Sequence, residues 1–249
     1  MFNNQIALIT GAAAGIGRAT ALEFARKGAT ILAADMNETA GQALLKELQS
    51  LGATASFCKT DVSNLDEVNH LMEQCIQKYD RLDHLINNAG VAHELTFFEA
   101  LTDEQWHRTI AVNQTGVFYC MRAGLKIMRN QKGGSIVNTA SVAGLGAAPR
   151  LGAYAATKHA VVGLTKTAAH EYGKYNIRIN CVCPSVISTN MGMAYIEDDE
   201  QVKQMLKSFV PMKRFGEPIE VAKAICWMSS KDASYLNGVA LRVDGGFKA

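Results

Sequence analysis

Long apolar runs are missing from this chain of 249 residues. No stretch approaches the roughly 18 consecutive apolar residues that a membrane-spanning helix requires, which excludes a transmembrane helix. The first residues, 1–5, are largely polar, and the apolar run behind them soon meets a glycine-rich turn. We therefore expect no secretory leader and a cytoplasmic protein.

The chain also lacks an excess of charge of either sign. Its formal net charge is only +2, and lysine and arginine form no run. We therefore expect neither nucleic acid nor a membrane surface as a partner. Internal repeats, low-complexity stretches and linkers rich in proline or serine are missing too. A single domain over residues 1–249 is expected, because α/β domains often reach about 200–250 residues.

The six cysteines are scattered, and only Cys181 and Cys183 form a close pair. Both lie in a strand-like run, 177–183, and no second Cys/His pair completes a zinc site. We interpret the cysteines as buried, reduced thiols and expect no bound metal. Free thiols are typical of a reducing compartment.

Seven short apolar runs alternate with longer helical patterns. Most of them are continuously apolar, as strands covered on both faces are. They span residues 5–10, 30–34, 54–58, 84–87, 134–139, 177–183 and 239–243. This alternation predicts an α/β fold with a doubly wound, Rossmann-type sheet of about seven mostly parallel strands and helices on both faces. Ligands of such sheets bind beyond the carboxyl ends of the strands.

Several helix starts are recognisable. Thr102 and Gln105 have the spacing of a capping box. Ser63 is suited to cap a helix that runs to Tyr79, and Pro218 is suited to a first helical turn.

A glycine-rich turn joins the first predicted strand to the first helix. Gly11, Gly15, Ile16 and Gly17 have the pattern G-x-x-x-G-x-G. The glycines let the backbone approach a pyrophosphate, which the free N–H groups of a helix N-terminus then bind. Many such turns are merely tight turns, but the position of this one favours a dinucleotide site.

Asp35 ends the second predicted strand, 24 residues after Gly11. A carboxylate there accepts hydrogen bonds from the ribose hydroxyls of NAD and repels the 2′-phosphate of NADP. The alternative is a helix cap, a role to which Asn37 is equally suited. No lysine or arginine occupies Ala14, Met36 or Asn37, so NAD is favoured over NADP.

Polar residues and a glycine follow the next two strands. Asp61 and Val62 follow the third, and Asn88 and Gly90 follow the fourth. Either group is compatible with ordinary turn chemistry. Both lie where an extended dinucleotide would pass, and Asp61 is placed to reach an adenine amino group.

Tyr154 and Lys158 are four residues apart in a predicted helix, 152–172, and therefore share a face. A tyrosine is a poor base at neutral pH unless a cation stabilises its phenolate, and Lys158 is placed to be that cation. Ser141 follows the fifth strand, where its hydroxyl can bind a substrate oxygen or serve only in a turn. No G-x-S-x-G elbow surrounds Ser141, which disfavours a serine hydrolase. Asn113 lies in the helix that begins after Thr102.

In order and spacing these motifs resemble those of the short-chain dehydrogenase/reductase family. The matching segments are 10–17, 61–62, 87–90, Asn113, Ser141, 154–158 and 243–246. The resemblance implies that Tyr154 exchanges a proton with the alcohol or carbonyl oxygen and that Ser141 orients this oxygen. It implies that Lys158 lowers the tyrosine pKa and binds the nicotinamide ribose, while Asn113 helps to hold a water.

The resemblance also implies cofactor contacts from Ile187 and Thr189 and a homotetramer or dimer. One position departs from the family pattern, because Ser185 follows Pro184 where a glycine is usual. We expect this side chain to change the shape of the substrate pocket.

Residues 190–216 are expected to close over the substrate as a lid. The side chains expected to face the substrate are mostly apolar: Leu145, Leu151, Val186, Met191, Met193 and Tyr195. His93 and Glu94 are candidates for polar selectivity, although a surface position is the simpler interpretation of His93.

The sequence thus predicts an NAD(H)-dependent dehydrogenase or reductase for a moderately apolar secondary alcohol or ketone. One alternative is an NADPH-dependent 3-oxoacyl-acyl-carrier-protein reductase, which Asp35 without a neighbouring cation disfavours. The other is a non-catalytic NAD-binding regulator. The complete set of Asn113, Ser141, Tyr154 and Lys158 disfavours that reading.

Overall fold

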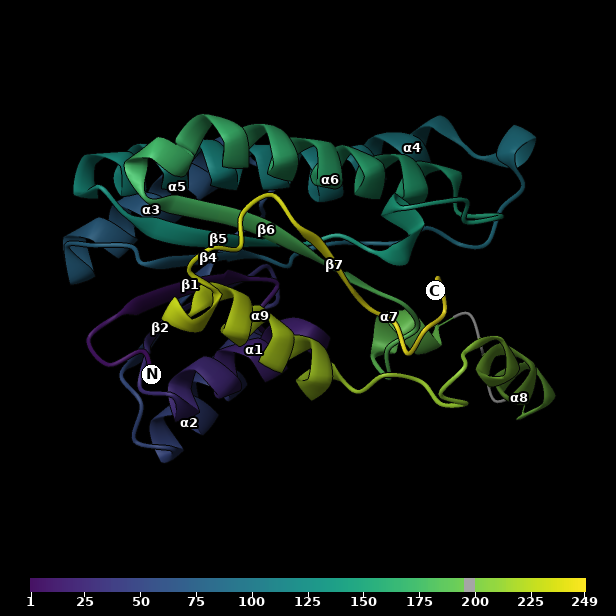
Figure 1. Ribbon diagram of the computed structural model, residues 1–249, viewed down its shortest axis with the longest axis horizontal. Coiled ribbons are helices and arrows are strands. Elements are labelled where there is room, and N and C mark those ends of the chain that lie inside the picture. Colours follow the sequence, from purple (N-terminus) through teal and green to yellow (C-terminus); the bar gives the residue numbers. More distant parts are fainter. Residues whose placement is uncertain (195–199) are drawn as a thin grey trace.

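The computed structural model describes residues 1–194 and 200–249, and within these ranges seven parallel strands form one twisted sheet (Figure 1). The strand order is β3-β2-β1-β4-β5-β6-β7. The strands are β1 (Ile6–Thr10), β2 (Thr30–Asp35), β3 (Ala55–Lys59), β4 (His84–Asn87), β5 (Gly134–Thr139), β6 (Ile177–Pro184) and β7 (Ala240–Val243). The predicted doubly wound sheet is confirmed, and every strand boundary falls within one residue of the prediction.

Helices cover both faces of the sheet (Figure 1). One face carries α1 (Gly15–Arg26), α2 (Glu38–Ser50) and α9 (Pro218–Ser229), and the other carries α3 (Leu65–Tyr79), α5 (Val117–Gln131) and α6 (Gly152–Tyr172). Successive strand residues supply opposite cores, with Leu8 packed on the α3 side and Ile9 on the α1 side. Each core therefore holds one face of the sheet rigid, and the strand ends are fixed relative to one another.

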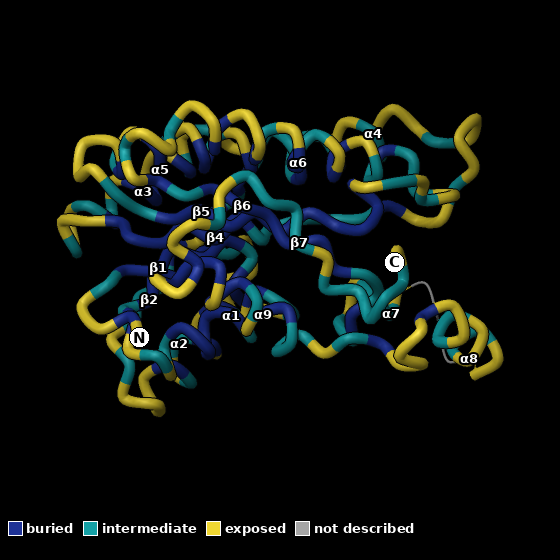
Figure 2. Tube along the Cα trace, viewed as in Figure 1, coloured by how far each residue is buried: buried dark blue, intermediate teal, exposed yellow. Residues whose placement is uncertain are grey.

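The remaining elements are short or lie at the edges. They are η1 (Phe98–Ala100), α4 (Asp103–Ile110), the π-helix η2 (Ala111–Gly116), η3 (Val142–Gly144), η4 (Gly173–Tyr175), α7 (Asn190–Met193), α8 (Glu200–Phe209) and η5 (Lys231–Ala233). Helix α8 stands apart from the body, and none of its residues is buried (Figure 2). The predicted substrate-facing Tyr195 lies outside the described residues. No helix within 1–194 or 200–249 has the length and apolar character to cross a bilayer.

Two predicted helix starts are confirmed, and one is wrong. The hydroxyl of Thr102 accepts the Gln105 N–H at 3.2 Å, and the Gln105 side chain accepts the Thr102 N–H at 3.2 Å. Pro218 opens α9 as predicted. Ser63 does not cap α3: the adjacent Asn64 does, accepting the N–H of Asp66 at 3.0 Å.

All six cysteines are buried free thiols, as predicted. Cys181 and Cys183 lie on β6 and face the core on the α6 side. Among the residues that the structure describes, no three His, Cys, Asp or Glu side chains gather in a way that could hold a metal ion.

Candidate active site

The predicted glycine-rich turn is tightly packed against the turn that follows β4. Gly11 has φ +61°, and a Cβ there would come within 2.7 Å of the Cα of Ala89. A Cβ on Gly17 would collide with the carbonyl of Gly11. Ala14 occupies the N-cap of α1 without a side-chain cap, so the first N–H groups of this helix have no side-chain partner. A bare helix N-terminus behind a close-packed glycine turn fits the pyrophosphate of a dinucleotide.

Asn88 joins these two turns. Its amide nitrogen donates to the carbonyls of Thr10 at 3.2 Å and Gly11 at 3.0 Å. The Thr10 hydroxyl in return accepts the backbone N–H groups of Asn88 and Ala89, at 3.1 and 3.2 Å. The carboxyl ends of β1 and β4 therefore form one rigid unit. Thr10 was predicted only as part of the matching segment 10–17, although a polar residue ending an apolar strand is a visible signal.

Asp35 lies against the glycine-rich turn. Its carboxylate accepts the Ala13 N–H at 2.9 Å and the Asn37 N–H at 2.9 Å. Asn37 is the cap of α2, because its side chain accepts the Ala40 N–H at 3.0 Å. Asp35 is thus not needed as a cap. None of the described lysine or arginine side chains forms an ion pair with Asp35.

Asp61 and Val62 differ in what they offer a ligand. The Asp61 carboxylate accepts the N–H of Ser63 at 2.9 Å and its hydroxyl at 2.7 Å. The side chain of Val62 is buried against the end of η2, since a Cβ on Gly116 would lie 2.7 Å from its Cγ2. Only the backbone of Val62 is therefore suited to contact a cofactor.

Lys158 is a buried cation on α6. Its Nζ donates to the carbonyl of Thr139, at the end of β5, at 2.8 Å. Burial lowers the pKa of this ammonium to about 8. Nζ also lies 5.4 Å from the centroid of the half-buried Tyr154 ring. The predicted pair is therefore brought together, with the cation held in place by a backbone carbonyl that leaves no signature in the sequence.

Asn113 lies in the π-helix η2, which interrupts the helix predicted after Thr102. Its side chain accepts the Val91 N–H and donates to the Val91 carbonyl, both at 2.8 Å. A Cβ on Gly90 would lie 3.3 Å from the Asn113 Oδ1 and 3.6 Å from the Lys158 Nζ. Gly90, Asn113 and Lys158 thus converge on one point. Irregular π turns are often found at functional sites.

Ser141 follows β5 and is buried at its carboxyl end. Its hydroxyl donates to the Pro184 carbonyl at 3.4 Å and accepts the Ala143 N–H at 3.1 Å. The turn η3 that follows packs on α6, since a Cβ on Gly144 would lie 2.5 Å from the Lys158 carbonyl oxygen. This packing holds the Ser141 turn against the helix that carries Tyr154.

Gly15 and Thr189 join the cofactor turn to the segment after β6. A Cβ on Gly15 would come within 3.1 Å of the Thr189 Cγ2. The Thr189 hydroxyl accepts the Gly192 N–H at 3.0 Å, and the buried Ile187 packs with the core that also receives Ile16. The residues expected to contact the cofactor after β1 and after β6 are therefore neighbours.

The expected surface position of His93 is wrong. This side chain is only 7% exposed, and its Nδ1 bonds to the Glu94 carbonyl at 2.7 Å. Because a carbonyl only accepts, the proton belongs on Nδ1. The loop folds back on itself here, as the Thr96 hydroxyl also donates to the Glu94 carbonyl at 2.9 Å.

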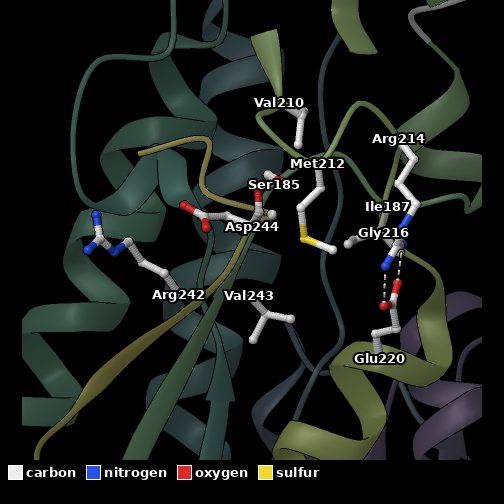
Figure 3. A pocket seen from close by; sticks show the side chains of 11 residues that line it. Ser185, Ile187, Val210, Met212, Arg214, Gly216, Glu220, Arg242, Val243 and Asp244 are labelled. Carbon is white, nitrogen blue, oxygen red and sulfur yellow. Dashed lines mark hydrogen bonds and ion pairs between the residues drawn. The ribbon is translucent and has the colours of Figure 1, made fainter. Parts of the chain in front are cut away.

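A cavity of about 260 Å³ lies beside Ser185 (Figure 3). Its lining comes from residues 185–187, 210–216, Glu220 and 242–245, and includes none of Asn113, Ser141, Tyr154 and Lys158. The Ser185 hydroxyl donates to the Asp244 carbonyl at 3.3 Å. Leu145 and Met191, two of the expected substrate-facing residues, are about 40% exposed.

Comparisons with known proteins agree over nearly the whole chain. A family model described as Enoyl-(Acyl carrier protein) reductase matches residues 11–248. The 3-oxoacyl-(acyl-carrier-protein) reductase FabG of Thermotoga maritima is 38% identical over 242 residues, 97% of each chain. Cyclohexanol dehydrogenase of an Acinetobacter species is 39% identical, over 99% of this chain and 96% of its own. The crystal structure of levodione reductase superposes with a TM-score of 0.96 at 34% identity, over 99% of this chain and 98% of that one.

Proposed function

The chain belongs to the short-chain dehydrogenase/reductase family, and from this premise we propose that it is an NAD(H)-dependent oxidoreductase that interconverts a secondary alcohol and a ketone. The observation that carries the proposal is the buried Lys158 ammonium, which lies 5.4 Å from the Tyr154 ring centroid. Gly90 and Asn113 lie next to the Lys158 ammonium. A buried cation beside a phenol is a costly arrangement that lends itself to proton transfer.

In the proposed site, Tyr154 donates a proton to the substrate oxygen in reduction and removes one in alcohol oxidation. The positive charge of Lys158 favours the phenolate and so lowers the pKa of Tyr154. The Ser141 hydroxyl is available to the same oxygen, because its present bond to the Pro184 carbonyl is a long 3.4 Å. When bound, the nicotinamide cofactor gives or accepts the hydride.

We propose that Asn113 helps to hold a water near Lys158. Both ends of its side-chain amide are engaged by Val91, so the side chain fixes the turn and leaves the water to backbone groups. In a π-helix the carbonyls no longer follow the regular α-helical pairing. This supports a backbone carbonyl of η2 as the acceptor.

The preference for NAD is proposed from Asp35. Its carboxylate is tied to the glycine-rich turn by the Ala13 N–H. Arg18, on the neighbouring first turns of α1, is paired with Glu47 instead. A 2′-phosphate would therefore meet a negative charge with no cation to offset it. Asp61, Val62, Asn88, Gly90, Ile187 and Thr189 are proposed to complete the cofactor site.

For the substrate we propose a moderately apolar, alicyclic alcohol or ketone. Two of the relatives are a cyclohexanol dehydrogenase and a levodione reductase. Residues 190–216 are proposed as the lid, and the exposed Leu145 and Met191 supply apolar surface. The match to FabG makes a 3-oxoacyl-acyl-carrier-protein reductase the second candidate.

We further propose a cytoplasmic homotetramer. Support comes from large apolar side chains exposed at two separate places, Phe98 and Phe118 near α4 and α5, and Trp227 and Tyr235 near α9. Six buried free thiols are typical of a protein from a reducing compartment.

A substrate panel with either cofactor tests the proposal. Purified protein is assayed with NADH and NADPH on alicyclic ketones and on 3-oxoacyl thioesters. We expect NADH-dependent reduction of the ketones, whereas activity confined to the thioesters with NADPH would favour the second candidate. Tyr154→Phe should lower kcat by about 10²–10⁴-fold with NADH binding retained. Tyr172→Phe, at the other end of α6, is the matched control.

A further inference from the structure

The carboxyl-terminal residues 244–249 form a closed turn. The Asp244 carboxylate accepts the N–H groups of Gly246 and Lys248, both at 3.0 Å. The Asp244 carbonyl accepts the Phe247 N–H at 3.1 Å. Gly245 and Gly246 have φ of +61° and +86°, conformations that a side chain would strain. The turn is therefore a defined piece of structure rather than a loose end.

The base of the lid packs against this turn. Of the described residues between 200 and 216, only Val210 and Phe215 are buried. Val210 packs on the turn, since a Cβ on Gly245 would come within 2.8 Å of its Cγ1. The Met212 N–H donates to the Gly245 carbonyl at 3.3 Å. Figure 3 shows the Met212 side chain beside Asp244, with Val210 above both.

The turn also reaches the two other segments beside the proposed substrate site. Ser185 donates its hydroxyl to the Asp244 carbonyl at 3.3 Å. A Cβ on Gly146, in the loop after Ser141, would lie 3.7 Å from the Lys248 Nζ. One short segment therefore contacts Ser185 and the base of the lid and lies close to the loop after Ser141.

We propose that the turn 244–249 determines substrate specificity by setting the distance between the lid and the loop after Ser141. Gly245 and Ser185 are its positioning residues: Gly245 admits Val210, and Ser185 tethers the turn to the end of β6. This proposal rests on the proposed function, because it assigns the turn to the substrate site of that reaction. It also gives a role to the serine that stands where the family usually has glycine.

A pair of glycine substitutions tests the proposal. Gly245→Ala strains the backbone and displaces Val210. Gly52→Ala is the matched control, because Gly52 has φ +75° and nothing within 4 Å of the added Cβ. We expect Gly245→Ala to raise KM for the ketone about tenfold, with kcat and the KM for NADH nearly unchanged. We expect Gly52→Ala to change none of these constants.

Two further variants examine the tether. Ser185→Gly should raise the ketone KM in the same direction as Gly245→Ala. Ser185→Thr keeps the hydroxyl and should keep a KM near that of the wild type. Equal ketone KM values for Gly245→Ala and Gly52→Ala would overturn the proposal. A fall in kcat together with a comparable rise in the KM for NADH would also overturn the proposal, because that pattern indicates general damage to the protein.

A proteolysis assay separates this proposal from the proposed function. Trypsin can cleave at Lys207, Lys213 and Arg214, which lie on either side of Val210 at the base of the lid. Gly245→Ala should be cut here faster than the wild type, and Gly52→Ala should not. Equal rates would overturn the anchoring of the lid whatever the substrate. A wild type without turnover on the whole panel would instead overturn the proposed function, and the role in specificity with it.

Discussion

Replacement of Lys158 by methionine is expected to abolish turnover without destabilising the cofactor-free protein. Burial lowers the pKa of this ammonium from 10.5 to about 8. Each tenfold change in proton affinity corresponds to about 1.4 kcal/mol, so the buried charge costs about 3 kcal/mol at pH 7. Methionine removes this cost but leaves the Thr139 carbonyl without its 2.8 Å donor, a loss of about 1–3 kcal/mol. The variant should therefore equal or exceed the wild type in stability, by up to about 2 kcal/mol.

The pH dependence gives the sharper measurement. Between pH 8 and 10.5 the unfolded chain binds more protons at Lys158 than the folded chain, so wild-type stability rises with pH in this window. Below pH 8 the cost of the buried charge is fully present. Relative to Lys158→Met, the wild type should gain about 1.4 kcal/mol between pH 7 and pH 9. Titrating groups that do not interact with Lys158 are common to both proteins and cancel.

The assay is urea unfolding of both proteins at pH 7 and pH 9, without nucleotide. The free energy of unfolding is compared at each pH, and turnover is measured on the same samples. A difference between the two proteins that is the same at both pH values would refute a lowered Lys158 pKa. A variant that turns over normally would remove Lys158 from the proposed mechanism.

Three other variants have definite expected outcomes. Asp35→Ala combined with Met36→Arg should shift nucleotide preference toward NADPH; fluorescence titration measures this, and an unchanged NADH preference would show the charge argument to be wrong. Asn113→Ala removes both 2.8 Å bonds to Val91 and should lower the free energy of unfolding by about 1–3 kcal/mol along with kcat. A loss well below this in urea unfolding would contradict a positioning role. Thr102→Ala deletes a cap that accepts one N–H and should cost about 1 kcal/mol with kcat unchanged; a lower kcat would tie α4 to the site.

The fold was predictable because its strands are covered on both faces. The predicted strands 84–87 and 134–139 match β4 and β5 to the residue. The helix caps were less predictable, because Ser63 and Asn64 are adjacent and both residue types favour the N-cap. In the structure Asn64 is the N-cap, because it directly precedes the first residue of α3.

The local shape of the candidate site was less predictable than its residues. Within the π-helix η2, Asn113 pairs with Val91, 22 residues earlier in the chain. No periodicity within residues 111–116 encodes that contact. Lys158 is held by a backbone carbonyl, and a carbonyl belongs to every residue alike. The burial of His93 likewise arises from a loop that folds back on itself, which a residue type alone does not reveal.

The six buried thiols can report when the packed layers of the protein separate, because they react only once they are exposed. Burial raises the pKa of Cys75 and of Cys120 to about 12, so at neutral pH these sulfurs are neither accessible nor ionised. An alkylating reagent can therefore reach them only when the packed layers part. Cys226 lies on the buried face of α9, and the other five lie on the opposite side of the sheet. Identifying the alkylated peptides over time would show whether the two halves of the molecule open together or one before the other.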